Sequence, residues 1–134
     1  MFFKTWLGRF LSLALVAVIT LSGCTTNPSG LTGNYTQDTL TVIETLRSAI
    51  NSDKTDEGDT ELKTLARSQI NDYVSRYRRD DKKGGSRSFT TMQTALNALA
   101  GYYSSYGNRP LPEKLKTRLD KEFRQVEISL KRGL

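Results

Sequence analysis

Apolar side chains recur at steps of three or four residues in four separate stretches of this chain. That spacing places them on one face of an α-helix, whereas a half-buried strand would alternate at every second residue. No convincing alternating stretch occurs, so the pattern predicts an all-α protein. The recurring residues are Leu40, Ile43, Leu46, Ala49 and Ile50; then Leu62, Leu65, Ala66, Ile70, Tyr73, Val74 and Tyr77; then Phe89, Met92, Ala95, Leu96, Leu99, Tyr102, Tyr103 and Tyr106; and finally Leu115, Leu119, Phe123, Val126 and Leu130.

Capping and turn residues set the expected limits of these helices and leave short connections between them. Short connections favour antiparallel neighbours, so we expect residues 35–134 to form an up-down-up-down four-helix bundle. The expected limits are a cap at Asn34 or Thr36, a second cap at Asp59 or Thr60, a start near Ser88 with a stop at Gly107, and a last helix from Pro112 at its first position to Gly133.

The N-terminal residues have the features of a bacterial lipoprotein signal. Lys4 and Arg9 accompany the apolar run 11–21, which is short for a membrane span, and the sequence Leu-Ser-Gly-Cys then ends at Cys24. We therefore predict a cleaved signal peptide over 1–23, acylation of Cys24, and a flexible, lipid-anchored tether over 24–34, where Pro, Gly, Ser and Thr are frequent. The alternatives are a retained anchor helix and a small buried cysteine.

The composition removes most enzyme classes and most metal sites. The chain has no histidine and one cysteine, the predicted acylation site. A disulfide, a soft-ligand metal site and a Cys-His or Ser-His nucleophilic pair are thereby excluded. Residues 53–64 approach a calcium-loop pattern, but Thr64 stands where that loop needs a bidentate glutamate, so helix-capping acids explain the pattern better. We expect no catalysis, no cofactor and no metal.

Positive charge gathers at the connection between the second and third helices. The chain carries 20 Lys and Arg against 14 Asp and Glu, a formal net charge of +6. In the expected bundle, the tether, this connection and the C-terminus share one end. Such an end suits an anionic surface, although solvated helix termini explain the same residues, and nucleic acid is disfavoured for an exported lipoprotein. The charged residues are Arg76, Arg78, Arg79, Lys82, Lys83 and Arg87, with Asp80 and Asp81 among them.

Three tyrosines lie near the end of the third helix. An aromatic cofactor box is one interpretation of Tyr102, Tyr103 and Tyr106, but their helical spacing favours the core for most of them. Neighbouring helical residues point about 100° apart, so we expect one of Tyr102 and Tyr103 to be buried and the other to lie at a boundary. A boundary tyrosine beside Asn108 and Arg109 suits a protein partner.

Four stretches of the chain carry a resemblance to a known family. They are Asn71-Asp72-Tyr73-Val74-Ser75-Arg76-Tyr77-Arg78-Arg79, Ser88-Phe89-Thr90-Thr91-Met92-Gln93-Thr94-Ala95-Leu96-Asn97-Ala98-Leu99, Tyr103-Ser104-Ser105-Tyr106-Gly107-Asn108-Arg109-Pro110 and Pro112-Glu113-Lys114-Leu115. These stretches resemble the photosystem II lumenal assembly lipoproteins, the family called Psb twenty-seven. The similarity covers nearly all of the chain after the signal, and the lipoprotein signal that ends at Cys24 indicates the cyanobacterial type.

This resemblance implies a non-catalytic assembly and repair factor on the lumenal side of the thylakoid membrane. It implies transient docking on the lumenal domain of the smaller chlorophyll-binding inner antenna subunit of photosystem II, before the manganese–calcium cluster is complete. The alternative function is a lipid-anchored envelope bundle that binds anionic lipid or an envelope protein. We expect a monomer when free. The candidate partner-binding residues are Arg76, Arg78, Arg79 and Asp80 after the second helix, and Tyr106, Asn108 and Arg109 after the third.

Overall fold

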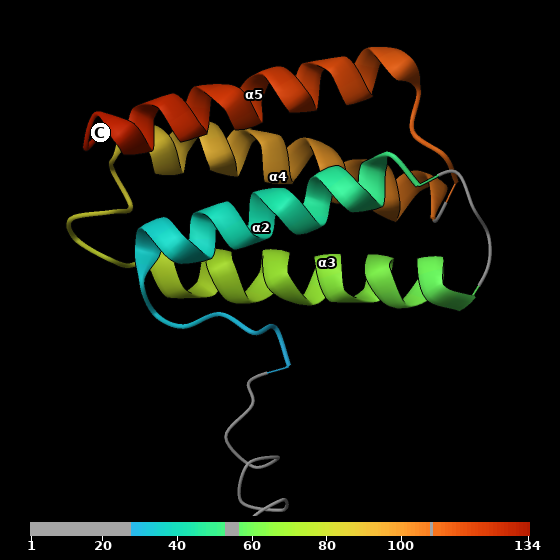
Figure 1. Ribbon diagram of the computed structural model, residues 1–134, viewed down its shortest axis with the longest axis horizontal. Coiled ribbons are helices and arrows are strands. Elements are labelled where there is room, and N and C mark those ends of the chain that lie inside the picture. Colours follow the sequence, from blue (N-terminus) through green and yellow to red (C-terminus); the bar gives the residue numbers. More distant parts are fainter. Residues whose placement is uncertain (1–27, 53–56, 108) are drawn as a thin grey trace, which may run out of the picture. The chain divides into compact units, whose positions relative to one another are not determined.

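The computed structural model describes residues 28–52, 57–107 and 109–134 and divides the chain into two units. The first unit, Met1–Gly30, is described only at residues 28–30, which include a turn. The described part of the second unit, Leu31–Leu134, contains four helices. Successive helices run in opposite directions (Figure 1), which confirms the predicted up-down-up-down bundle. The helices are α2 (Tyr35–Ile50), α3 (Glu57–Tyr77), α4 (Arg87–Tyr106) and α5 (Glu113–Lys131).

The helix limits agree with the capping signals at three of the four starts, to within one or two residues. Asn34 caps α2 by accepting a hydrogen bond from the Gln37 amide, and Ser86 caps α4 by accepting one from the Phe89 amide. Pro112 is the N-cap of α5 rather than its first helical residue, a difference of one position that is common at helix ends. The predicted cap of α3 at Asp59 or Thr60 is wrong, because that helix already begins at Glu57.

The core consists of apolar side chains from all four helices. Helix α2 packs most closely on α3 and α4 on α5, while α2 also contacts α5 and α3 contacts α4. The predicted stripe on α2 contains one error, since Leu40 is 45% exposed and Val42 is fully buried in its place. The largest fully buried side chains are Tyr73, Phe89, Phe123, Ile43, Leu46, Ile50, Met92, Leu96, Leu99, Leu119, Val42 and Val126.

Aromatic rings fill the end of the core nearest the start of α2. The ring centroids of Tyr35 and Tyr77 lie 5.1 Å apart, and Tyr73 stacks on Phe89 at 5.9 Å. The Tyr73 hydroxyl is satisfied inside the bundle, because it pairs with the Thr39 hydroxyl at 2.9 Å. Burial raises the pKa of the Tyr73 phenol, so this group stays neutral and acts as a packing and hydrogen-bonding element.

A buried carboxylate fastens the segment that precedes α2 to the bundle. Asp38 is 1% exposed and accepts hydrogen bonds from the Thr32 amide (2.8 Å), the Thr32 hydroxyl (2.9 Å), the Gly33 amide (2.9 Å) and the Tyr77 hydroxyl (2.6 Å). Leu31 is 5% exposed and belongs to the core. The predicted tether over 24–34 is therefore too long at its C-terminal end, because residues 31–34 are part of the bundle.

A salt-bridge pair joins α2 to α5. The Arg47 guanidinium donates from Nε to Asp120 at 3.2 Å and from Nη1 to Glu127, and it lies over the Phe123 ring. The hydrogen bond and charge of Glu127 raise the pKa of Arg47 above its usual range. Because these side chains are about one third exposed, the pairs fix the register of the two helices more than they add stability.

Candidate functional site

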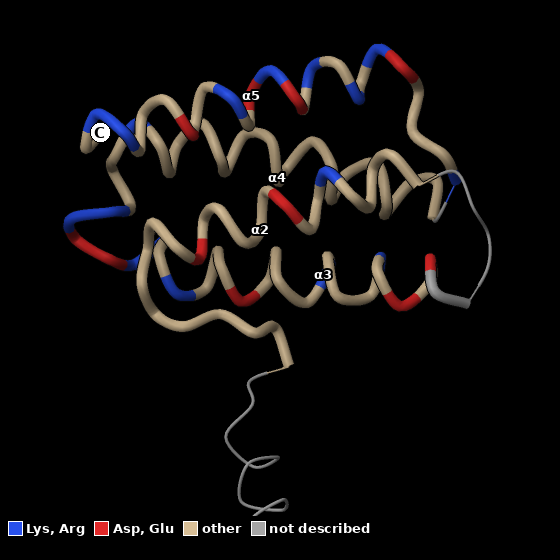
Figure 2. Tube along the Cα trace, in the orientation of Figure 1, with Lys and Arg blue, Asp and Glu red and all other residues tan. Residues whose placement is uncertain are grey.

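The connection between α3 and α4 exposes several cationic side chains to solvent. We call residues 76–87 the basic loop. Arg78, Arg79, Lys82 and Lys83 are exposed, and Figure 2 shows this end of the bundle marked by Lys and Arg. Arg76 instead pairs with Asp72 one turn back on α3, with 2.9 Å between Nε and Oδ1. That hydrogen bond raises the pKa of Arg76.

Asp80 shapes this loop. Its Oδ1 accepts hydrogen bonds from the Lys82 and Lys83 amides, each at 2.9 Å, which lowers the pKa of Asp80. The chain then turns so closely at Gly84 that an added Cβ would lie 2.7 Å from the Arg78 carbonyl oxygen. Of the four predicted contact residues here, Arg78 and Arg79 are therefore the exposed cations, whereas Arg76 and Asp80 have structural partners.

The second predicted group lies at the end of α4, and we call Tyr106 and Arg109 the distal surface. Tyr106 is 56% exposed, and its ring lies 4.9 Å from that of Tyr102. The Tyr102 hydroxyl donates to the Pro110 carbonyl at 2.8 Å, which ties the connection back to the helix. Arg109 is exposed, while the predicted contact residue Asn108 lies outside the described residues. We expected one of Tyr102 and Tyr103 to be buried and the other to lie at a boundary, and this is confirmed; the structure shows that Tyr103 is the buried one and Tyr102 the partly buried one.

The basic loop and the distal surface are at opposite ends of the bundle. Figure 1 shows the α3–α4 connection at one end and the α4–α5 connection at the other. A partner that approaches end-on meets one group, whereas a partner that lies along the side of α3 and α4 reaches both.

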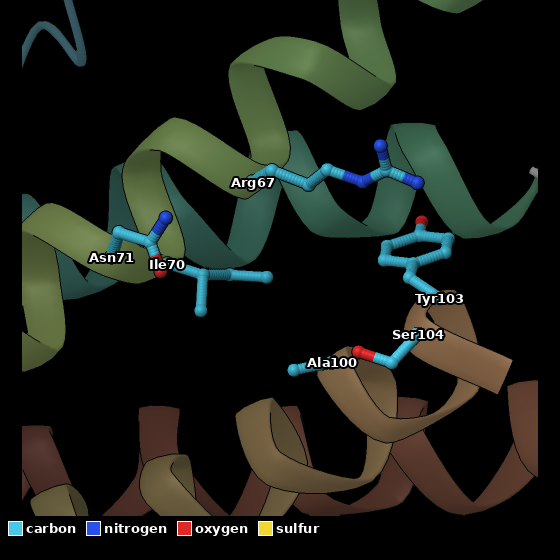
Figure 3. A pocket seen from close by; sticks show the side chains of 6 residues that line it. All are labelled: Arg67, Ile70, Asn71, Ala100, Tyr103 and Ser104. Atoms are coloured by element: carbon cyan, nitrogen blue, oxygen red, sulfur yellow. The ribbon is translucent and has the colours of Figure 1, made fainter. Parts of the chain in front are cut away.

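A groove between α3 and α4 lies on that side, and sequence reasoning did not single it out. It has a volume of about 320 Å³ and is drawn in Figure 3 with its lining side chains from both helices. Helix α4 contributes small residues to this groove. In a sequence, small residues on a helix indicate close packing against a neighbour as readily as they indicate a groove. The lining residues are Arg67, Ile70, Asn71, Ala100, Tyr103 and Ser104.

The residues of the calcium-loop pattern that the structure describes do not support a calcium site. Asp59 pairs with Lys63 on α3 at 2.8 Å, and both side chains are 4% exposed. Lys63 thereby lowers the pKa of Asp59 and compensates its charge. Among residues 28–52, 57–107 and 109–134, no His, Cys, Asp and Glu side chains gather into a metal-binding group. Asp53 and Thr55 lie outside these ranges.

The predicted acylation site, Cys24, lies outside the described residues, so the geometry does not bear on it. Within the described ranges, no helix combines the length and the apolar character that crossing a bilayer requires.

The sequence matches known proteins over nearly its whole length. The family described as Photosystem II Pbs27 matches residues 7–130. Photosystem II lipoprotein Psb27 of Synechocystis is 59% identical over 133 residues, which are 99% of this chain and 98% of that protein. Photosystem II assembly factor lipoprotein Psb27 of Thermosynechococcus vestitus is 52% identical over 92% of this chain and 89% of its own length. The solution structure of Psb27 from cyanobacterial photosystem II has a TM-score of 0.72 at 63% identity, covering 79% of this chain and 92% of that one.

These findings confirm the resemblance seen in the helices and extend it to the fold. One relative is named an assembly factor, which agrees with the expectation of a non-catalytic protein. Both relatives are cyanobacterial and are named as lipoproteins. The chain belongs to the Photosystem II Pbs27 family.

Proposed function

We propose that this chain is a non-catalytic, lipid-anchored assembly and repair factor of photosystem II. It is anchored through Cys24 to the lumenal side of the thylakoid membrane. It docks transiently on the lumenal domain of the smaller inner antenna subunit before the manganese–calcium cluster is complete, and it leaves before the extrinsic subunits complete the complex.

The observation that carries this proposal is similarity over 92% of the chain to a protein named a photosystem II assembly factor lipoprotein. The fold supports it in physical terms. A small bundle with a closed apolar core and exposed charges at its ends can bind a protein surface and leave again without unfolding. Cations steer such an encounter and contribute mainly to the association rate.

Within the predicted contact residues, Arg78 and Arg79 are the strongest candidates at the basic loop. Arg76 and Asp80 support them, because Arg76 pairs with Asp72 and Asp80 holds the loop amides. Tyr106, with Asn108 and Arg109 after it, forms the second candidate surface. An exposed tyrosine offers a large apolar area with a polar end, which suits a protein interface.

The second candidate function is binding to anionic lipid or to an envelope protein. The exposed Lys82 and Lys83 of the basic loop favour it, since each cation near an anionic membrane contributes about 1 kcal/mol.

The proposal is tested by affinity purification of a tagged, acylation-competent chain from solubilised thylakoids, followed by mass spectrometry. Immature photosystem II, enriched in the inner antenna subunit and lacking mature extrinsic subunits, is the expected companion. A Cys24→Ser variant serves as the control for anchoring and is expected to be depleted from the membrane fraction. Recovery of envelope proteins or of lipid alone would instead support the second function and contradict the first.

Charge reversal tests the basic loop. An exposed ion pair contributes about 0.2–1 kcal/mol, and reversal also adds repulsion, so the double variant Arg78→Glu with Arg79→Glu should weaken docking roughly 5- to 100-fold. Arg118→Glu with Arg124→Glu, on the exposed face of α5, reverses the same number of charges as a matched control and should bind normally. Unchanged retention of the double variant, with normal helicity, would exclude the basic loop as the docking contact.

A further inference from the structure

Exposed cations gather where the basic loop meets the end of α5 (Figure 2). The two segments are neighbours, because the lysines of the loop and residues 133–134 after α5 line one small cavity. Four cations belong to this surface, two from the loop and two from the end of α5, and all four side chains are exposed. We call them the lysine cluster: Lys82, Lys83, Lys131 and Arg132.

The structure leaves the lysine cluster without acidic partners. Across the described part of the chain, none of its four side chains forms an ion pair, whereas Arg124 on the same helix α5 pairs with Asp120 at 3.2 Å. The loop also contains acids, but residues 78–83 carry four cations and two acids. This end of the bundle therefore keeps a net positive charge that is available to an anionic partner.

The residue types favour a diffuse negative surface over a partner of fixed shape. Three of the four cations are lysines, whose ammonium groups are compact charges on flexible stems and impose little geometry on a partner. A protein carboxylate is better matched by the planar fork of an arginine, and the loop presents Arg78 and Arg79 directly after α3. Headgroups of anionic lipids offer many negative charges in one plane, so they fit the lysine cluster.

The chain runs toward its proposed anchor from this same end of the bundle. The Asp38 carboxylate, near the start of α2, binds the Thr32 amide at 2.8 Å and the Tyr77 hydroxyl, at the end of α3, at 2.6 Å. Leu31, one residue earlier, is 5% exposed and belongs to the core. Seven residue steps separate Leu31 from Cys24, which can span at most about 23–25 Å. An acylated Cys24 therefore keeps this end of the bundle close to the bilayer.

The distal surface lies at the other end of the bundle (Figure 1). Helix α4 separates it from the basic loop and has 20 residues, which at 1.5 Å per residue is a length of about 30 Å. Charges that far from the membrane are screened from it, because the Debye length is about 8 Å at physiological salt. When the lysine cluster contacts the headgroups, the distal surface faces away from the bilayer.

We propose that the lysine cluster contacts the headgroups of anionic lipids in the membrane that holds the anchor, so that the bundle stands on its basic-loop end. This inference rests on the proposed function, because the anchor at Cys24 is part of it. The lipid contact then positions the bundle for docking instead of being a separate function. It leaves Arg78 and Arg79 to a membrane-embedded partner that stands beside the bundle.

Vesicle binding tests the contact without the lipid anchor. The chain from residue 24 onward with Cys24→Ser keeps the whole bundle, and it should bind vesicles of equimolar phosphatidylglycerol and phosphatidylcholine but not phosphatidylcholine alone. Each cation near an anionic surface contributes a factor of about five in affinity, so Lys82→Gln with Lys83→Gln should weaken binding roughly 25-fold. Lys114→Gln with Lys121→Gln removes the same charge from exposed positions on α5 and should weaken it less than about threefold. Equal losses in the two pairs, or equal binding to both kinds of vesicle, would overturn the proposal.

Fluorophores on single cysteines measure the orientation of the bundle. In the Cys24→Ser chain, a label at Gly85→Cys, an open position of the basic loop, should be quenched by lipids that carry a quencher on the headgroup. A label at Ser105→Cys, exposed in the last turn of α4, should not be quenched. Equal quenching at the two positions, or quenching only on α4, would show that the bundle does not stand on the basic-loop end.

Detergent-solubilised immature photosystem II separates this inference from the function on which it rests. The Lys82→Gln and Lys83→Gln double variant should bind these complexes as well as the unmodified chain does, because no bilayer is present. Weaker binding of that variant would make the lysines a protein contact and overturn the lipid assignment. If the unmodified chain itself does not bind, the proposed function fails, while the vesicle measurements still decide the lipid contact.

Discussion

Replacing Asp38 by asparagine tests whether one buried carboxylate holds the start of the bundle together. The carboxylate accepts four hydrogen bonds, two on each oxygen. An asparagine keeps one carbonyl oxygen for Thr32 but presents an amide NH₂ to the Gly33 amide, which cannot accept. The Tyr77 hydroxyl can rotate to accept from the new amide. One bond is therefore lost outright, and the others lose their charge assistance.

The magnitude follows from these bonds. A hydrogen bond to a charged group contributes about 1.5–3 kcal/mol, roughly twice as much as a neutral one. Thr32 and Gly33 are exposed residues, so water replaces part of what is lost, and burying a neutral amide costs less than burying a charge. We expect Asp38→Asn to lower the free energy of unfolding by about 2–4 kcal/mol. Asp81→Asn, in the exposed loop, should stay within about 0.5 kcal/mol.

Urea unfolding followed by circular dichroism measures this difference, and amide hydrogen exchange at Thr32 and Gly33 locates it. Burial alone would raise the pKa of Asp38, but the hydrogen bonds from Tyr77, Thr32 and Gly33 outweigh burial and hold the pKa below its ordinary value. The carboxylate therefore stabilises the fold above the ordinary pKa of aspartate, and this contribution disappears as the pH falls through the lowered pKa. The difference in the free energy of unfolding between the unmodified chain and Asp38→Asn should therefore become smaller below about pH 4. A loss under 0.5 kcal/mol, with exchange unchanged at both amides, would refute the reasoning.

Three further substitutions test the packing. Leu96→Ala should cost about 2–5 kcal/mol in a urea titration, because this side chain is 1% exposed and its removal leaves a cavity; a cost below 1 kcal/mol would mean that the core collapses around it. Gly84→Ala should lower the thermal midpoint, because the added Cβ would meet the Arg78 carbonyl oxygen at 2.7 Å, and an unchanged midpoint would show that the loop relaxes freely. Gly101→Ala, in an open position on α4, should stabilise the chain by about 0.5–1 kcal/mol, and a decrease would indicate an unseen contact.

The helices were predictable because their apolar residues recur with the helical period. The face of α2 that is buried was not predictable in the same way. Leu40 lies in the three-to-four residue series, yet α2 contacts both α3 and α5, and the arc facing those two helices contains Val42 instead. Asp38 and Thr39 also lie on that arc. Residue type alone assigns such polar side chains to the surface. Their burial becomes favourable because both are hydrogen-bonded, Asp38 to Thr32, Gly33 and Tyr77, and Thr39 to the Tyr35 carbonyl and the Tyr73 hydroxyl.

For the candidate docking residues, the sequence predicted exposure wherever a charged side chain has no partner within the fold. Arg78 and Arg79 are exposed as a cationic run would suggest, while the partners of Arg76 and Asp80 depend on local geometry that spacing does not fix. The groove escaped prediction because it arises between two helices. Arg67 and Tyr103 are 36 positions apart in the sequence, and neither residue alone differs from an ordinary surface cation or core tyrosine.

The start of α2 and the end of α5 lie at the same end of the bundle, where Tyr35, Thr36, Gly133 and Leu134 line one small cavity. A short glycine-rich linker could therefore join these two points, and the chain could be reopened between Gly107 and Pro112 at the far end. A circular permutant that carries the proposed lipid attachment at its new N-terminus would have it at the opposite end of the bundle. Docking of this permutant would show whether the end from which the bundle is anchored matters.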